Sequence, residues 1–305
     1  MSRVEQLSGV LVALASPLKR DGAVDEAAVG RLVEHVLAGG VHGLLPLGST
    51  GETASLDEVA RRQVLAAVVK AANGRVPVIC GVAQSQLSSA RVEVEAAAKL
   101  GADAALVAPP FYYPIDQAGV LAFYRQVAER ASVPVLVYNI PQFTKVVIEP
   151  ATLATLAREG TIQGVKDSSR DFEYFEALCV ATRDMPGFRV FTGSDTMLLA
   201  SLAMGGAGTI CGAANIAPHW VVRIFDEFQR GELEAARSSQ DRLYELVMAL
   251  RAGVFPSAIK AALHLQGICE PWPAPPLARL NERHEARLRD QLARWGLLTA
   301  ERSRH

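Results

Sequence analysis

The sequence predicts an α/β fold, a (β/α)8 TIM barrel with a C-terminal helical extension. Short apolar runs alternate with amphipathic or alanine-rich stretches, and the runs start roughly 20–35 residues apart, which suits one strand, one helix and their loops. The runs are mostly continuous in apolar residues rather than alternating with polar ones, as in residues 133–138, which indicates strands buried on both faces of a parallel sheet. With 305 residues, half of them hydrophobic, the chain is long enough to form such a barrel as one domain.

Eight runs are expected to form the strands of the barrel. They are residues 9–15, 43–47, 76–82, 104–108, 133–138, 162–166, 189–192 and 208–211. An open, doubly wound sheet is the alternative fold. Eight similar units favour closure instead, and no Gly-x-Gly-x-x-Gly motif follows the first strand.

Helices are expected between these strands. Residues 57–72 carry apolar side chains at helical spacing, with Asp57 as a candidate N-cap. Residues 90–100 are rich in alanine, glutamate and lysine, which are strong helix formers. We expect residues 1–217 to form the barrel. Residues 218–305 are expected to add its last helix and further helices within the same domain, with 301–305 frayed.

Composition excludes several classes of protein. The net charge of −1 does not indicate a nucleic-acid or membrane-surface partner. No apolar run reaches the roughly 18 residues of a membrane span, and residues 1–14 lack the pattern of a secretion signal. The cysteines and histidines form no pair with metal-ligand spacing and predict no disulfide framework. We therefore expect a cytoplasmic protein with no structural metal.

Polar residues follow the predicted strands, at the end of a barrel where catalytic residues lie. Lys166 is the most informative, because it alone among the six lysines ends an apolar strand. Burial disfavours the charged form of a lysine, and a neutral amine is the form that attacks a ketone. The alternative is a structural lysine paired with a carboxylate. Asp167 is not the obvious partner, since successive strand side chains point to opposite faces.

Two further strand ends carry candidate residues. Tyr138 ends the strand before that of Lys166, where a phenol is able to transfer protons, although a core tyrosine is the alternative. Residues 48–52, Gly-Ser-Thr-Gly-Glu, resemble an anion-binding turn in which Ser49 and Thr50 add hydroxyl donors. A simple strand-to-helix turn would show the same pattern.

These segments, in this order, resemble the dihydrodipicolinate synthase / N-acetylneuraminate lyase family of class I aldolases. The resemblance covers nearly the whole chain. It is carried by Gly48-Ser-Thr-Gly-Glu52, Tyr138-Asn-Ile-Pro141, Gly164-Val-Lys-Asp167, Gly193-Ser-Asp195 and residues 9–17 and 205–215.

The resemblance implies a role for each matching residue. Lys166 matches the lysine that forms a Schiff base with a 2-oxo acid, and Tyr138 matches the general acid and base. Ser49 and Thr50 match the pair that binds the substrate carboxylate, and Thr50 also links Tyr138 into a proton relay. Tyr112 matches a tyrosine that, in the synthases, reaches into a neighbouring subunit's site.

The carbonyl of Ile210 lies where the family lines the site beside the lysine. The resemblance further implies a homotetramer built as a dimer of dimers. It implies a small-molecule substrate and needs no metal or organic cofactor.

The sequence also departs from the family. The lysine-pathway synthases carry an arginine two residues after the proline of the Tyr-Asn-x-Pro motif, and Phe143 stands there in this chain. Segments 110–114 and 138–141 look more like sialic acid lyase. Asp195 matches one of its sugar-binding acids, whereas Thr196 replaces a second.

These features give a ranked set of functions. We expect a lyase that releases pyruvate from a 2-keto-3-deoxy sugar acid or a related 4-hydroxy-2-oxo acid, with Asp195 and Thr196 binding hydroxyls. The alternatives are a dehydratase acting on a similar acid, the lysine-pathway synthase that condenses pyruvate with aspartate semialdehyde, and a non-catalytic sugar-acid sensor.

Overall fold

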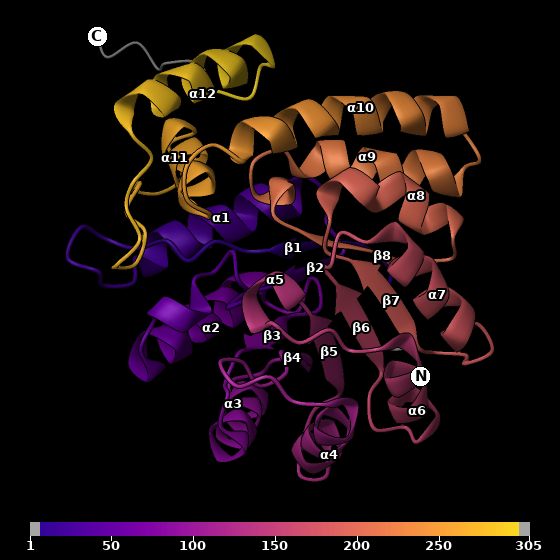
Figure 1. Ribbon diagram of the computed structural model, residues 1–305. Coiled ribbons are helices and arrows are strands. Elements are labelled where there is room, and N and C mark those ends of the chain that lie inside the picture. Colours follow the sequence, from indigo (N-terminus) through magenta and orange to yellow (C-terminus); the bar gives the residue numbers. More distant parts are fainter. Residues whose placement is uncertain (1–6, 299–305) are drawn as a thin grey trace, which may run out of the picture.

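The computed structural model describes residues 7–298 and confirms the predicted barrel (Figure 1). Eight parallel strands form one sheet in the order β2-β1-β8-β7-β6-β5-β4-β3. A parallel bridge between Leu44 and Val78 joins the two ends of that order and closes the barrel. The strands are β1 (Gly9–Ala13), β2 (Gly43–Leu45), β3 (Ile79–Val82), β4 (Ala104–Val107), β5 (Val135–Asn139), β6 (Gly164–Asp167), β7 (Arg189–Thr192) and β8 (Gly208–Cys211).

The helices follow the strands in turn and surround them (Figure 1). The helices of the barrel are α1 (Glu26–Ala38), α2 (Glu58–Ala72), α3 (Leu87–Lys99), α4 (Gln117–Ala128), α5 (Pro141–Thr144), α6 (Pro150–Arg158), α7 (Phe172–Thr182), α8 (Leu198–Ala203) and α9 (Pro218–Gln229). Short 3-10 turns are η1 (Thr53–Ser55), η2 (Asp195–Met197) and η3 (Ala213–Asn215).

Three more helices follow α9 within the described residues, as predicted for the segment after residue 218. They are α10 (Leu233–Leu250), α11 (Ser257–Leu265) and α12 (Glu282–Arg294). Helix α10 packs along α9, and α11 contacts both α10 and α12. Figure 1 shows these orange and yellow helices gathered on one side of the barrel. The predicted fraying of 301–305 lies outside the described residues.

Local capping explains several element boundaries. The predicted cap at Asp57 is confirmed, because its side chain accepts the N–H of Ala60 at 2.8 Å. Strands β3 and β5 begin later than predicted, after Pro77 and Pro134. Proline has no N–H to donate to a sheet, so it is disfavoured inside a strand.

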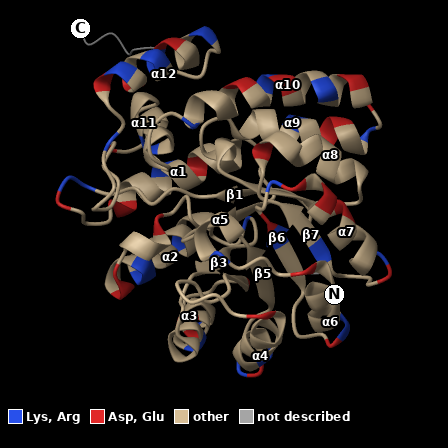
Figure 2. Cartoon of the chain, in the orientation of Figure 1, with Lys and Arg blue, Asp and Glu red and all other residues tan. Residues whose placement is uncertain are grey.

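The apolar residues form two packed layers on either side of the sheet. On β1, Val10 and Val12 point outward to the helices, whereas Leu11 and Ala13 point into the barrel. Tyr138 belongs to the inner layer. In contrast, Figure 2 shows most charged residues on the outer helices and loops. Among residues 7–298, no helix is long and apolar enough to cross a membrane.

Candidate active site

Lys166 and Tyr138 lie side by side on neighbouring strands. They are register partners between β6 and β5, and both side chains are almost completely buried. The Lys166 Nζ donates a hydrogen bond to the Tyr138 hydroxyl at 3.4 Å and lies 4.4 Å from the centre of its ring. The arrangement places an amine and a phenol within proton-transfer reach of each other.

Asp167 faces away from Lys166, as the strand alternation predicts. Its carboxylate accepts hydrogen bonds from Asn139 Nδ2 at 2.8 Å and from the backbone and hydroxyl of Ser169. Burial raises the pKa of Asp167, and these hydrogen bonds oppose that rise. Within the described part of the chain, Lys166 forms no ion pair. The alternative of a structural lysine paired with a carboxylate is therefore not supported by the described residues.

The turn that carries Ser49 and Thr50 connects β2 to η1. It is bounded by two residues with left-handed backbone, Leu47 (φ 61°) and Glu52 (φ 58°), a conformation that side chains other than glycine adopt at a cost. Among residues 7–298, the backbone N–H groups of Ser49 and Thr50 find no hydrogen-bond acceptor. The turn therefore offers two free N–H donors beside two hydroxyls.

A buried ion pair holds this turn from behind. Glu52 and Lys260 are both completely buried and lie 3.0 Å apart. Glu52 also accepts the N–H of Ala274 at 2.6 Å, and Lys260 donates to the carbonyls of Ser16 and Trp272. The pair thus ties the turn to α11 and to the proline-rich segment that follows it. Sequence reasoning missed Lys260 because it lies within a helical pattern far from the turn.

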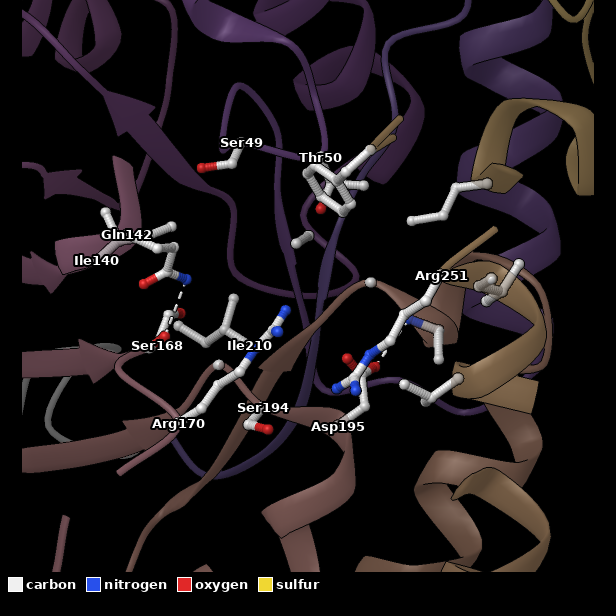
Figure 3. A pocket seen from close by; sticks show the side chains of 18 of the residues that line it. Ser49, Thr50, Ile140, Gln142, Ser168, Arg170, Ser194, Asp195, Ile210 and Arg251 are labelled. Atoms are coloured by element: carbon white, nitrogen blue, oxygen red, sulfur yellow. Dashed lines mark hydrogen bonds between the residues drawn. The ribbon is translucent and has the colours of Figure 1, made fainter. Parts of the chain in front are cut away.

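A pocket of about 290 Å³ opens in front of these residues (Figure 3). Six of the predicted site residues line it, namely Ser49, Thr50, Tyr138, Lys166, Asp195 and Ile210. The Ser49 hydroxyl contacts the Tyr138 hydroxyl, with 3.3 Å between the two oxygens. The resemblance assigned that link to Thr50, which is buried and lines the pocket.

Two predicted residues lie outside the lining. The Thr196 hydroxyl pairs with that of Ser194 at 3.2 Å, and Ser194 lines the pocket in its place. Tyr112 is 82% exposed, has a left-handed backbone (φ 83°) and packs edge to face against Tyr113. In this single chain Tyr112 does not contribute to the pocket.

Asp195 contributes a partly buried carboxylate to the pocket. Its Oδ1 accepts the N–H of Ala213 at 2.9 Å, and its carbonyl accepts a hydrogen bond from Gln240. Burial raises the pKa of Asp195, whereas the Ala213 N–H and the charge of Lys166 oppose that rise. The acid is therefore held in a fixed position near the amine.

Several lining residues were not among the site residues predicted from the sequence. Gln142, Phe143, Ser168 and Arg170 follow β5 and β6, so the strand-end rule would have found them. Arg251 and Phe255 come from the loop after α10 and are distant in sequence. A Cβ at Gly193, the residue after β7, would meet the Ser168 hydroxyl first and would lie 2.8 Å from the Lys166 Cε, so glycine lets the chain pass close to both side chains.

No set of three His, Cys, Asp or Glu side chains among residues 7–298 is arranged to hold a metal ion. The site as described consists of an amine, a phenol, hydroxyls and free backbone donors around a pocket.

Comparison with known proteins gives a consistent relationship along the whole chain. The profile of the dihydrodipicolinate synthetase family matches residues 6–294. A 4-hydroxy-tetrahydrodipicolinate synthase of Hyphomonas neptunium is 38% identical over 291 residues, covering 95% of this chain and 99% of that protein. A DapA-like lyase of Halobacterium salinarum with no characterised function is 37% identical over 292 residues, covering 96% of this chain and 95% of that one.

Solved structures share the fold closely. Dihydrodipicolinate synthase from Thermotoga maritima superimposes with a TM-score of 0.93 at 32% identity, covering 96% of this chain and 99% of that one. A prophage protein of the same family from E. coli K12, solved in complex with pyruvate, gives a TM-score of 0.92 at 27% identity, covering 95% and 99%.

Proposed function

The chain belongs to the dihydrodipicolinate synthetase family, and on that premise we propose that Lys166 forms a Schiff base with pyruvate or a pyruvate-derived 2-oxo acid. The chain is a class I, pyruvate-dependent lyase, as are the members of this family. The observation that carries the assignment to Lys166 is its position. It is the buried lysine of the pocket, without a carboxylate partner in the described residues, and it touches the hydroxyl of Tyr138.

The substrate carboxylate binds to the turn at Ser49 and Thr50. Their two unpaired N–H groups and their hydroxyls supply donors for both oxygens of a carboxylate. This places the adjacent ketone near the Lys166 amine, on the same side of the pocket as Tyr138.

The amine then adds to the ketone carbon, and the carbonyl oxygen leaves as water after two proton transfers. Tyr138 is the group that moves these protons, because its hydroxyl lies within reach of both Lys166 and Ser49. In the resulting iminium, the electrons of the C3–C4 bond move toward nitrogen as the C4 hydroxyl loses its proton. An aldehyde departs, the enamine is protonated at C3, and water releases pyruvate and the free amine.

The substrate that this pocket fits is a 2-keto-3-deoxy sugar acid or a related 4-hydroxy-2-oxo acid. Gln142, Ser168, Ser194 and Asp195 supply hydrogen-bonding groups beyond Lys166, where the hydroxyls of such an acid would extend. Phe143, at the position of the synthases' arginine, is apolar and lies against Phe255 at a centroid distance of 6.4 Å. That position offers no forked donor for the carboxylate of aspartate semialdehyde.

The lysine-pathway reaction is a second candidate, favoured by one finding. Several similar proteins, including that of Hyphomonas neptunium, carry the name 4-hydroxy-tetrahydrodipicolinate synthase. In that reaction the enamine that pyruvate forms on Lys166 would attack the aldehyde carbon of aspartate semialdehyde. A carbon–carbon bond would then form, whereas in the lyase reaction this bond breaks.

A substrate panel separates these reactions. Purified protein is given 2-keto-3-deoxy sugar acids, and released pyruvate is measured together with the length of the remaining carbon chain. The proposal predicts pyruvate and an aldehyde. A product that keeps the full carbon chain would instead show a dehydratase, and faster condensation of pyruvate with aspartate semialdehyde would show the synthase. Binding without turnover of any substrate would show a sensor.

We also propose a homotetramer, built as a dimer of dimers, in which Tyr112 of one subunit completes the site of its neighbour. The exposure of Tyr112 and its strained backbone support this role. The four cysteines are buried and unpaired, which fits the reducing cytoplasm that we propose as the location.

A further inference from the structure

The lining of the pocket carries more positive than negative charge. Lys166, Arg170 and Arg251 line it, and Asp195 is the acid among its lining residues. Arg170 follows β6 and Arg251 caps the C-terminal end of α10, so the two arginines reach the pocket from different elements. Figure 3 shows both side chains extending into the space beside Ser194 and Asp195.

Arg170 combines a strained backbone with an unpaired side chain. Its φ is 64°, a left-handed conformation that favours glycine. Among residues 7–298, no hydrogen bond or ion pair engages its guanidinium. Backbone strain of this kind clusters at active sites and ligand-binding loops.

Arg251 is similarly free of a carboxylate partner. Its contact within the protein is with the sulfur of Met248, at 3.9 Å. Surface arginines elsewhere in the described chain are commonly paired with glutamates, as Arg75 is with Glu34 and Arg125 with Glu159. Two arginines without a carboxylate partner among the described residues therefore lie together at one pocket.

We propose that Arg170 and Arg251 form a second anion site at the mouth of the pocket, which binds a carboxylate at the far end of the substrate. A guanidinium presents a planar fork that matches a carboxylate and keeps its charge at any working pH. One carboxylate then lies on the Ser49 turn and the other between the arginines. The substrate class becomes a 2-oxo diacid, such as a 2-keto-3-deoxy aldaric acid, in preference to acids that end in a hydroxymethyl group.

This inference rests on the proposed Schiff base at Lys166, so its test uses a readout that does not require carbon–carbon cleavage. Pairs of 2-oxo acids that differ in the distal carboxylate are compared, such as 2-oxoglutarate with 2-oxopentanoate and 2-oxoadipate with 2-oxohexanoate. Affinity is measured by calorimetry. Covalent capture on Lys166 is followed by borohydride reduction and peptide mass, with pyruvate as the reference acid.

The variants are Arg170→Gln, Arg251→Gln and the double substitution. Arg170→Gly removes the guanidinium while favouring the same left-handed backbone, so loss of selectivity in that variant does not result from a distorted loop. Arg183→Gln, an exposed arginine at the end of α7 outside the pocket lining, is the matched control.

We expect at least one diacid to bind about ten-fold more tightly than its monoacid partner, as a charge-assisted hydrogen-bond pair provides. Each single substitution at Arg170 or Arg251 reduces the preference, and the double substitution removes it. Arg183→Gln retains the preference, and in the Arg170 and Arg251 variants the affinity for pyruvate, which has no distal carboxylate, falls less than that for the diacids.

Equal affinity for diacids and monoacids would overturn the proposal, as would a preference that survives the double substitution. Loss of borohydride capture together with a retained diacid preference would count against the Schiff base and leave the anion site supported. The two proposals therefore fail separately.

Discussion

The Tyr138 hydroxyl contacts both groups that the proposed reaction uses. It lies 3.4 Å from the Lys166 Nζ and 3.3 Å from the Ser49 hydroxyl. The phenol belongs to the inner layer of the barrel, so its ring is held by packing while its hydroxyl faces the pocket. A single hydroxyl thus connects the amine to the turn that we propose binds the substrate carboxylate.

We predict that Tyr138→Phe lowers kcat by about 100-fold or more, the usual contribution of a positioned general acid–base group. The ring and its packing remain, so the thermal midpoint should change little. Steady-state kinetics and calorimetric unfolding measure the two effects. A rate near that of the native protein would exclude Tyr138 from proton transfer.

A second residue-scale prediction concerns pH and lies away from the site. His42 Nδ1 accepts the N–H of Val10 at 3.1 Å, and burial lowers the pKa of His42 below its ordinary value of 6.5. Below about pH 6.5 the unfolded chain therefore binds a proton that the folded chain does not. The free energy of unfolding should then fall as the pH drops from 6.5 toward the folded pKa.

The variant His42→Asn retains an acceptor but does not titrate. It should show a shallower loss of stability between pH 7 and pH 5 in urea unfolding. Some pH dependence should remain, because burial also lowers the pKa of His35 and of His219. An identical pH dependence in the variant and the native protein would contradict this assignment.

At the scale of elements, the sequence predicted the strand ends well because a closed parallel sheet places all of them at one edge. Lys166 and Tyr138 were found from that rule, and Asp195 was found through the family resemblance. The rule does not predict site residues that lie on elements other than the strand ends. Lys260 on α11 and Arg251 after α10 join the site through tertiary packing, which local apolar patterns do not encode.

The Glu52–Lys260 pair is the element-scale contact with the largest expected effect. Substituting either partner, as Glu52→Gln or Lys260→Met, leaves the other charge buried and unpaired, which typically costs about 3–5 kcal/mol of stability. The double variant should lose less than the sum of the two, as urea unfolding would show. Glu34→Gln, in an exposed pair with Arg75, is the control and should change stability little.

The same variants test whether the ion pair positions the carboxylate-binding turn. Because Glu52 closes that turn, a folded Glu52→Gln enzyme should show a raised KM for the 2-oxo acid with a smaller change in kcat. Additive losses of stability together with an unchanged KM would show that the pair does not hold the turn.

At the scale of the whole molecule, an exposed aromatic pair needs explanation. Tyr112 and Tyr113 are 82% and 76% exposed and stack edge to face at a centroid distance of 4.9 Å. Both follow β4 on the side of the barrel where the pocket opens. The sequence could suggest their role only through the family resemblance, because an interface between subunits leaves no periodic pattern within a chain.

We predict that sedimentation velocity detects a tetramer and that Tyr112→Phe lowers kcat without dissociating it. The phenylalanine retains the apolar contact and loses the hydroxyl that would serve the neighbouring site. Turnover unaffected by this substitution, or a protein that is monomeric at micromolar concentration and fully active, would contradict the role given to Tyr112.

The most direct test of the account is reduction with borohydride in the presence of pyruvate, followed by peptide mass analysis. The account predicts one reduced pyruvyl group per chain, attached to Lys166, and no adduct in Lys166→Ala. Lys145→Ala, which changes another lysine near the site, should be labelled as fully as the native protein. An unmodified chain, or an adduct on a different lysine, would contradict the Schiff base at Lys166.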